Sequence, residues 1–110
     1  MPKYLVHSSY GAEGVKAVIK EGGSSRREAV AQVAKALGGS LEACYFAFGD
    51  TDAFMIVDLP DNVTAAAGSL LGNAAQTHKT TLTVLITPEE LDQAAELARE
   101  KMAAYRPPGG

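Results

Sequence analysis

The sequence has no tryptophan, a single cysteine, no long apolar run and no excess of basic charge. The lone Cys44 cannot form an intrachain disulfide and cannot build a zinc cluster by itself. The longest apolar run, residues 43–48, has six residues, whereas a membrane span needs about 20, so no membrane segment is predicted. Ten basic and thirteen acidic residues give a net charge of −3, which disfavours general nucleic-acid binding, because affinity for a phosphate backbone requires a basic excess.

Small apolar side chains dominate what is present. The chain of 110 residues is 46% hydrophobic, yet it holds only three Phe and four Tyr, while 19 residues are alanine. This size and composition predict one globular domain over residues 1–105, followed by a flexible tail at 106–110 that contains two prolines and two glycines. The N-terminus lacks the apolar core of a secretion signal, so a cytoplasmic location is expected.

Hydrophobic periodicity and turn residues divide the chain into strands and helices. The expected strands span residues 3–10, 40–48, 53–59 and 77–86. The expected helices run from about residue 15 to the glycine pair at 22–23, from Ser25 to Leu37, from Asp61 to about residue 72, and from Thr87 to Tyr105. In the second strand, alternation assigns Leu41, Ala43 and Tyr45 to one face, and Cys44 and Phe46 to the other.

Four local signals mark helix ends. Ser25 with Glu28, and Thr87 with Glu90, have the spacing of a capping box, in which each residue bonds a backbone N–H at the helix start. Asp61 is the expected cap of the third helix. The glycine pair at 38–39 is expected to end the second helix, because glycine accepts a left-handed conformation.

The order of elements is β, two short helices, β, β, α, β and an added C-terminal helix. This order predicts an α+β, ferredoxin-like (βαββαβ) fold, with a four-stranded antiparallel sheet and helices on one face. Residues 43–48 and 53–59 are apolar at both alternating positions, which indicates that both sheet faces are covered. We expect a second copy of the chain to cover the open face, giving a homodimer or higher oligomer. The alternative is a curled sheet that the C-terminal helix covers in part.

Several short motifs, distributed from Met1 to about Glu90, resemble the GYD-domain family, a group of small bacterial proteins of uncharacterised function. The matching pieces are Pro2-Lys3-Tyr4, Glu13-Gly14, the segment 22–27, Leu37-Gly38-Gly39, the segment 45–49, Pro60-Asp61 and Thr87-Pro88-Glu89-Glu90. The resemblance implies a ferredoxin-like fold of the dimeric α+β barrel kind and implies no established reaction. The name motif reads Gly49-Asp50-Thr51-Asp52 here, so Thr51 replaces the family tyrosine and no role of that tyrosine carries over.

Few residues have side chains suited to chemistry. His7 and His78 lie on the first and last strands, which are neighbours in this fold, and with Tyr45 and Asp52 they form the candidate ligand pocket. Two histidines without a third ligand at metal-binding spacing do not predict a metal site, and no cofactor is expected. Arg26 and Arg27 near a helix start form a candidate anion-binding pair. A simpler interpretation of all these candidates is that their side chains are solvated or structural. Asp50 and Asp52 can stabilise a turn through bonds to its backbone, and the aromatic residues can pack in the core.

Two classes of function, and a purely structural assembly subunit, remain open at this point. The first is a homo-oligomeric small-molecule-binding or regulatory protein, favoured because no linked acid, base and nucleophile set is visible. The second is a small enzyme like those hosted by dimeric α+β barrels, either monooxygenase-like or isomerase-like, which is an analogy of fold alone. No catalytic residue is assigned, and apart from a second copy of the chain and a small-molecule ligand, no partner is expected.

Overall fold

A computed structural model describes residues 1–75 and 78–109 of the chain. Its elements, in chain order, are β1 (Lys3–Tyr10), α1 (Ala12–Glu21), α2 (Gly23–Ala36), β2 (Ser40–Phe46), β3 (Ala53–Asp58), α3 (Asn62–Ala74), β4 (His78–Leu85), α4 (Pro88–Lys101) and a 3-10 turn at Met102–Ala104. The predicted α+β class and the predicted order of elements are confirmed. The expected strand start at Thr77 lies outside the described residues.

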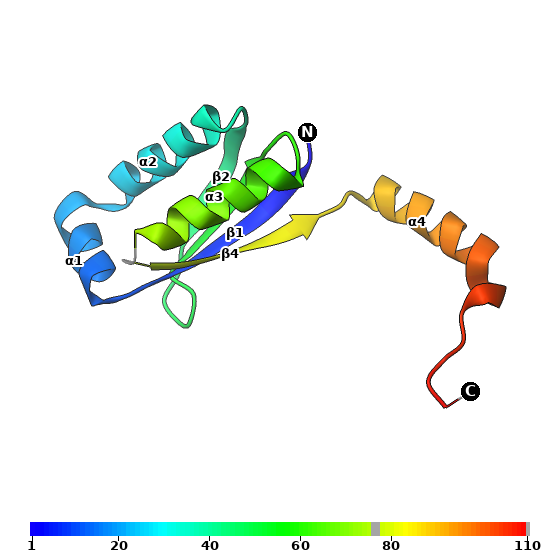
Figure 1. The fold of residues 1–110 in the computed structure, drawn as a ribbon. Coiled ribbons are helices and arrows are strands. Elements are labelled where there is room, and N and C mark those ends of the chain that lie inside the picture. Colours follow the sequence, from blue (N-terminus) through cyan, green and yellow to red (C-terminus); the bar gives the residue numbers. More distant parts are fainter. Residues whose placement is uncertain (76–77, 110) are drawn as a thin grey trace.

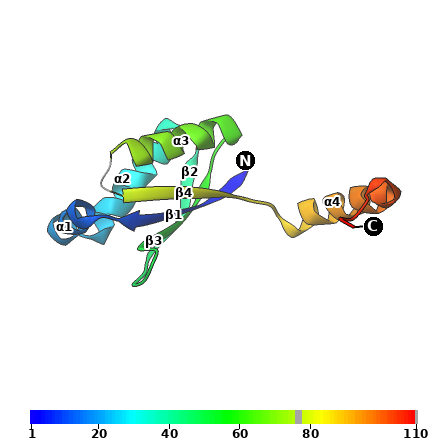
Figure 2. The ribbon, with the colours of Figure 1, turned by 60° about the horizontal axis from the view of Figure 1, so that its bottom comes forward.

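The four strands form one antiparallel sheet in the order β2-β3-β1-β4. This arrangement is consistent with the ferredoxin-like plan. Helices α2 and α3 lie along one face of the sheet, with α1 beyond its end (Figure 1). The view in Figure 2 shows these helices on one side of the strands and no helix on the other side. The sheet therefore has a helix-covered face and an open face.

The core lies between α3 and the helix-covered face. Tyr4, Val57, Leu59 and Ala65 form its buried cluster. Tyr4 exposes only 1% of its surface, and its hydroxyl donates a 2.7 Å hydrogen bond to the Oδ1 atom of Asn62 at the start of α3. This bond satisfies the one polar atom of a buried aromatic side chain and ties β1 to α3.

The structure confirms two of the three predicted helix starts. Asp61 accepts the backbone N–H of Thr64 at 2.8 Å and so caps α3. Thr87 and Glu90 form the predicted capping box of α4. The predicted capping box at Ser25 is wrong, because α2 begins earlier, at Gly23, and its N-cap Gly22 makes no side-chain cap bond. Gly22 adopts a φ of +83°, which lets α2 start directly after α1.

The predicted end of α2 is also confirmed. Gly38 has a φ of +86°, and the N–H of Gly39 donates to the carbonyl of Ala34 at 2.9 Å. A Cβ atom on Gly39 would collide with the carbonyl oxygen of Asp58, so this position allows β2 and β3 to approach each other.

Two details of β2 differ from the prediction. The strand ends at Phe46 instead of residue 48, because the N–H of Ala47 already bonds the carbonyl of Asp52 across the turn at 2.8 Å. A β-bulge between Leu41 and Ala43 reverses the alternation after Leu41. The predicted grouping of Leu41 with Tyr45 is therefore wrong: Leu41 packs on the core, while Tyr45 lies on the open face opposite Phe54.

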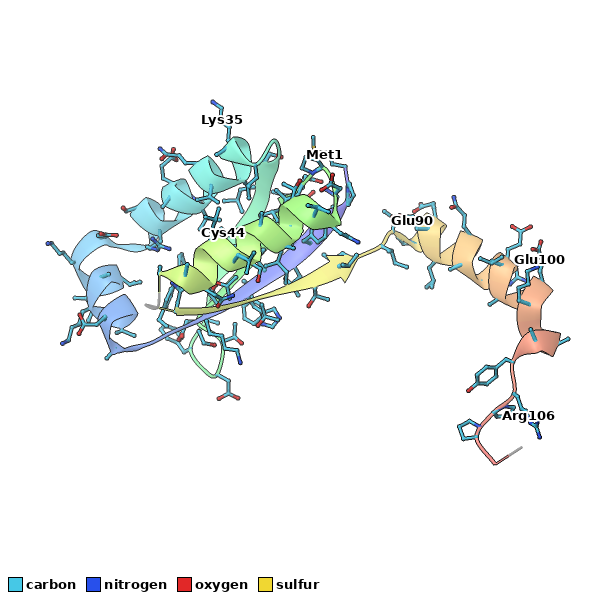
Figure 3. The ribbon with its side chains drawn as sticks, in the orientation of Figure 1. Met1, Lys35, Cys44, Glu90, Glu100 and Arg106 are labelled. Atoms are coloured by element: carbon cyan, nitrogen blue, oxygen red, sulfur yellow. The ribbon has the colours of Figure 1, made fainter. Side chains whose placement is uncertain are left out.

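Helix α4 extends away from the sheet and has no buried residue (Figure 1). Its side chains, including the labelled Glu90 and Glu100, stand clear of the other elements in Figure 3. The alternative in which the C-terminal helix covers the sheet is therefore wrong for this structure. The helix is also shorter than predicted, since it gives way to a 3-10 turn after Lys101 and Tyr105 lies beyond both. In the described ranges, no helix has both the length and the apolar character needed to cross a membrane.

Candidate functional site

A cavity of about 330 Å³ lies between α2, α3 and the helix-covered face of the sheet. It exists because both helices present small residues toward it: Ala29 and Ala34 on α2, and Gly68 and Gly72 on α3. The glycines also bring α3 close to its neighbours, since a Cβ on Gly72 would lie 2.9 Å from Oγ1 of Thr80 and one on Gly68 would lie 3.2 Å from Cδ1 of Leu37. The alanine- and glycine-rich composition thus leaves a space that larger side chains would fill.

The cavity is apolar along most of its length. Its wall includes the aliphatic or thioether side chains of Val6, Val30, Val33, Met55, Leu71 and Leu82. Ser8 and Thr80 also line it, but their hydroxyls lie 3.3 Å apart and can bond each other. A mostly apolar concave space with a few polar groups is typical of a small-molecule site.

Three polar side chains meet at the end of the cavity where β1 finishes and β4 begins. Tyr10 is the last residue of β1 and His78 is the first residue of β4, and the two are directly paired across the strands. Their rings contact edge to face, with centroids 5.8 Å apart and planes at 71°. Arg26, in the first turns of α2, lines the same cavity. This end therefore combines a phenol, an imidazole and a guanidinium.

His78 is electrostatically altered by this setting. Burial lowers the pKa of its imidazole below the ordinary value of 6.5, and the positive charge of Arg26 lowers that pKa further. Near pH 7 the imidazole is therefore neutral, and Arg26 supplies the positive charge at this end of the cavity. A neutral imidazole can both donate and accept a hydrogen bond.

The structure does not gather the other three members of the predicted ligand pocket around His78. His7 is paired with Thr81, whereas His78 is paired with Tyr10, three positions farther along β1. Because side chains alternate between faces, an odd offset places the two histidines on opposite faces of the sheet. His7 lies on the open face, where its ring stacks on that of Phe54 at a centroid distance of 6.2 Å.

Tyr45 and Asp52 also lie away from the cavity. Tyr45 is exposed on the open face, next to Phe54 on the neighbouring strand. Asp52 holds the turn between β2 and β3 against β1: its Oδ2 atom accepts the N–H of Tyr10 at 2.8 Å, and its own N–H donates to the carbonyl of Ser8 at 2.9 Å. The structural interpretation of Asp52 accounts for these contacts.

The predicted anion-binding pair is divided between two places. Arg26 lines the cavity, whereas Arg27 is outside its lining and lies close enough to Cys44 of β2 to act on its charge. Burial raises the pKa of the Cys44 thiol, and the charge of Arg27 offsets this only in part, so the thiol stays protonated near pH 7. Within the described part of the chain, no three side chains of the His, Cys, Asp and Glu types lie close enough together to hold a metal ion.

Sequence reasoning missed the glycines of α3 and the pairing of Tyr10 with His78. The sequence carries a signal for the first, because Gly68 and Gly72 are four residues apart and so share one helix face. Among the aromatic residues, Tyr10 lines the cavity, while Tyr45 and Phe54 lie on the open face.

Comparison with known proteins gives one match. The model of the GYD domain matches residues 4–95. The chain belongs to the GYD-domain family. No curated protein and no solved structure matches it significantly. The match covers the whole cavity of this GYD domain and the first half of α4, and it confirms the family resemblance read from the sequence.

Proposed function

We propose that this GYD-domain protein is a homo-oligomeric small-molecule-binding protein whose ligand occupies the cavity between α2, α3 and the sheet. The observation that carries the proposal is the cavity itself: its 330 Å³ falls within the range of roughly 300–1,000 Å³ that is usual for ligand sites. The side chains that line an unfilled cavity lose van der Waals contacts, which lowers the stability of so small a domain. A bound ligand would restore these contacts.

The open face of the sheet supports the oligomeric part of the proposal. Its exposed or half-buried side chains include Leu5, His7, Tyr45, Phe54, Ile56 and Leu85. A sheet face that stays in water is normally polar, whereas this one has an apolar centre, from Leu5 through Phe54 and Ile56 to Tyr45, beside polar residues such as Thr81 and Thr83 of β4. Packing of two such faces against each other buries these side chains and gives the dimeric α+β barrel arrangement.

A thermal-shift panel of aromatic, aliphatic and acidic metabolites tests ligand binding in the cavity. A ligand that binds the native state raises the melting temperature. We expect Ala29→Leu, which fills part of the cavity, to abolish the shifts seen with the wild-type protein. Ala36→Leu is the matched control, because Ala36 is exposed near the end of the same helix and does not line the cavity. A panel in which no compound raises the melting temperature, or in which Ala29→Leu responds like Ala36→Leu, contradicts the proposed site.

Light scattering at increasing protein concentration tests the oligomer. We expect the wild-type protein to have the molar mass of a dimer or larger assembly. Phe54→Lys should reduce the molar mass to that of a monomer, because a charge buried between two sheets is costly. Val63→Lys is the control, because Val63 is an exposed apolar residue of α3 on the helix layer. A wild-type protein that remains monomeric at micromolar concentration overturns the sheet-to-sheet interface.

One observation favours catalysis as a second candidate function. The pKa of His78 is lowered by burial and by Arg26, so its imidazole is neutral near pH 7 and able to accept a proton at one end of the cavity. Mass spectrometry of compounds incubated with the protein tests this candidate. Turnover that His78→Gln removes, while the thermal shift persists, favours an enzyme; binding without any turnover leaves the binding function alone.

A further inference from the structure

The charge of the cavity wall narrows the chemistry of its occupant. Among the described residues that line the cavity there is no Asp, Glu or Lys, and Arg26 is the one side chain with a permanent charge. The ionised form of a ligand that fits this wall is therefore an anion or a neutral molecule, not a cation, which Arg26 would repel.

Arg26 differs from Lys3 and Lys16 in its ion pairing, and from the other cations in that it lines the cavity. Lys3 pairs with Glu42 at 2.6 Å and with Asp58 at 2.9 Å, and Lys16 pairs with Glu13. No carboxylate within residues 1–75 and 78–109 forms such a pair with Arg26, although its side chain is partly buried. A partly buried guanidinium at the end of an apolar cavity retains its planar hydrogen-bonding edge for a ligand.

The rest of the cavity determines how much charge the ligand can carry. Its wall beyond Tyr10, Arg26 and His78 is aliphatic, apart from the mutually bonded Ser8 and Thr80, so it offers no further cation to a second negative charge. A dianion such as a phosphate ester would leave one charge poorly compensated in an apolar space. A carboxylate carries one charge and presents two oxygens to one guanidinium.

We propose that the cavity binds a small apolar monocarboxylate, with its carboxylate against the guanidinium of Arg26 beside Tyr10 and its hydrocarbon part along the wall between α2 and α3. This inference rests on the proposed function, because it names the ligand class of the same cavity. Tyr10 and His78 contribute hydrogen-bonding groups near the carboxylate. The neutral state of His78 near pH 7 also agrees with a ligand of a single negative charge.

Calorimetric titration of the full chain with octanoate, and with octanamide as a neutral ligand of the same length, tests the inference. Because a hydrogen bond to a charged group is worth about 1.5–3 kcal/mol, we expect octanoate to bind about 10-fold or more tightly than octanamide. Arg26→Gln should lower the affinity for octanoate to that for octanamide and leave the affinity for octanamide unchanged. Octylamine, the cationic analogue, should bind more weakly than both.

Arg27→Gln is the matched control, since it removes the same charge one residue along the same helix but outside the cavity. We expect Arg27→Gln to keep the preference for octanoate. Equal affinities of the wild-type protein for octanoate and octanamide, or equal losses in the two variants, overturn the carboxylate assignment. If octanamide binds and Ala29→Leu blocks it, the ligand cavity itself stands; if no compound of any class responds to Ala29→Leu, the proposed function fails as well.

Amide chemical shifts of the wild-type protein provide a second measurement that depends on no variant. Octanoate should shift the amide signals of Ala29, Gly72 and Thr80, which line the cavity, and leave those of Tyr45 and Phe54 on the open face unchanged. Shifts confined to the open face mean that octanoate binds there as a surfactant, which overturns the assignment.

Discussion

The two faces of the sheet are built from the same strands but differ in how far their side chains are buried and in what lies over them. Along β3, Met55 and Val57 on the covered face expose 5% and 4% of their surfaces. Phe54, which precedes Met55 and lies on the open face, exposes 40%. The covered face combines a packed core with a cavity that has one charged end. The open face has an apolar centre around Phe54 and Tyr45 with polar residues beside it, and no helix among the described residues lies over it. Because successive side chains of a strand point to opposite faces, the residues of the proposed ligand cavity and those of the proposed dimer interface alternate along the same strands. A substitution on one face therefore tests one proposal without changing the residues of the other.

The largest expected difference between the faces comes from truncating one tyrosine on each. Tyr4→Ala removes a fully buried ring and should lower the free energy of unfolding by about 3–5 kcal/mol. Tyr45→Ala removes a ring that is 72% exposed and should change it by less than about 0.5 kcal/mol in dilute protein. Urea denaturation at several protein concentrations checks both values.

Protein concentration sharpens the same pair of variants. If the open face binds a second copy, the cost of Tyr45→Ala grows with concentration, because dimer formation adds to the stability of the wild-type protein alone. A cost that stays the same from the lowest to the highest concentration speaks against the proposed interface.

The hydroxyl groups of these tyrosines give the next effect. Tyr4→Phe should lower the free energy of unfolding by about 1 kcal/mol, because the bond to Asn62 is lost. Tyr45→Phe should leave it unchanged, because no described residue bonds the Tyr45 hydroxyl. Chemical denaturation of both variants is the measurement, and equal losses would place the two rings in similar environments.

Removal of α4 tests whether either face depends on it. A chain that ends at Ile86 should keep the free energy of unfolding of dilute protein to within about 0.5 kcal/mol, because no residue of α4 is buried. A loss of several kcal/mol, measured by the same denaturation, means that α4 docks on one of the two faces in solution.

The smallest effect concerns the pH dependence of the covered face. The folded chain lowers the pKa of His78 below 6.5, so on acidification the unfolded chain takes up this proton first and the folded state loses stability. This contribution is complete above about pH 6.5 and is lost as the pH falls through the folded pKa. His78→Gln should therefore flatten the stability profile between pH 7 and pH 5 in thermal unfolding. If the melting temperatures of the wild-type protein and His78→Gln differ by the same amount from pH 7 to pH 5, burial does not lower the pKa of His78.

Much of the fold was predictable because it depends on local signals. The strand β1, the caps at Asp61 and Thr87 and the glycine stop at Gly38 each depend on a few neighbouring residues. Apart from the local capping box at Ser25, the errors in the strands fall where a distant contact decides. The β2 bulge at residue 42 depends on pairing with β3, and the strand end at Phe46 depends on a turn bond to Asp52.

The candidate site was harder to predict than the fold. Arg26 and His78 were both selected from the sequence, but for two different sites, because they are 52 positions apart and nothing local connects them. His7 was grouped with His78 because their strands are neighbours. The pairing register, which sequence does not reveal, places them on opposite faces.

The sequence by itself determined the class of fold, the family and the small side chains from which the cavity is made. Periodicity, capping and composition act over a few residues, and so they can be read along the chain. The tertiary structure decided which residues share a site. Strand order, register and the close approach of α3 bring Tyr10, Arg26 and His78 to one end of a cavity, because these depend on contacts between residues far apart in the chain.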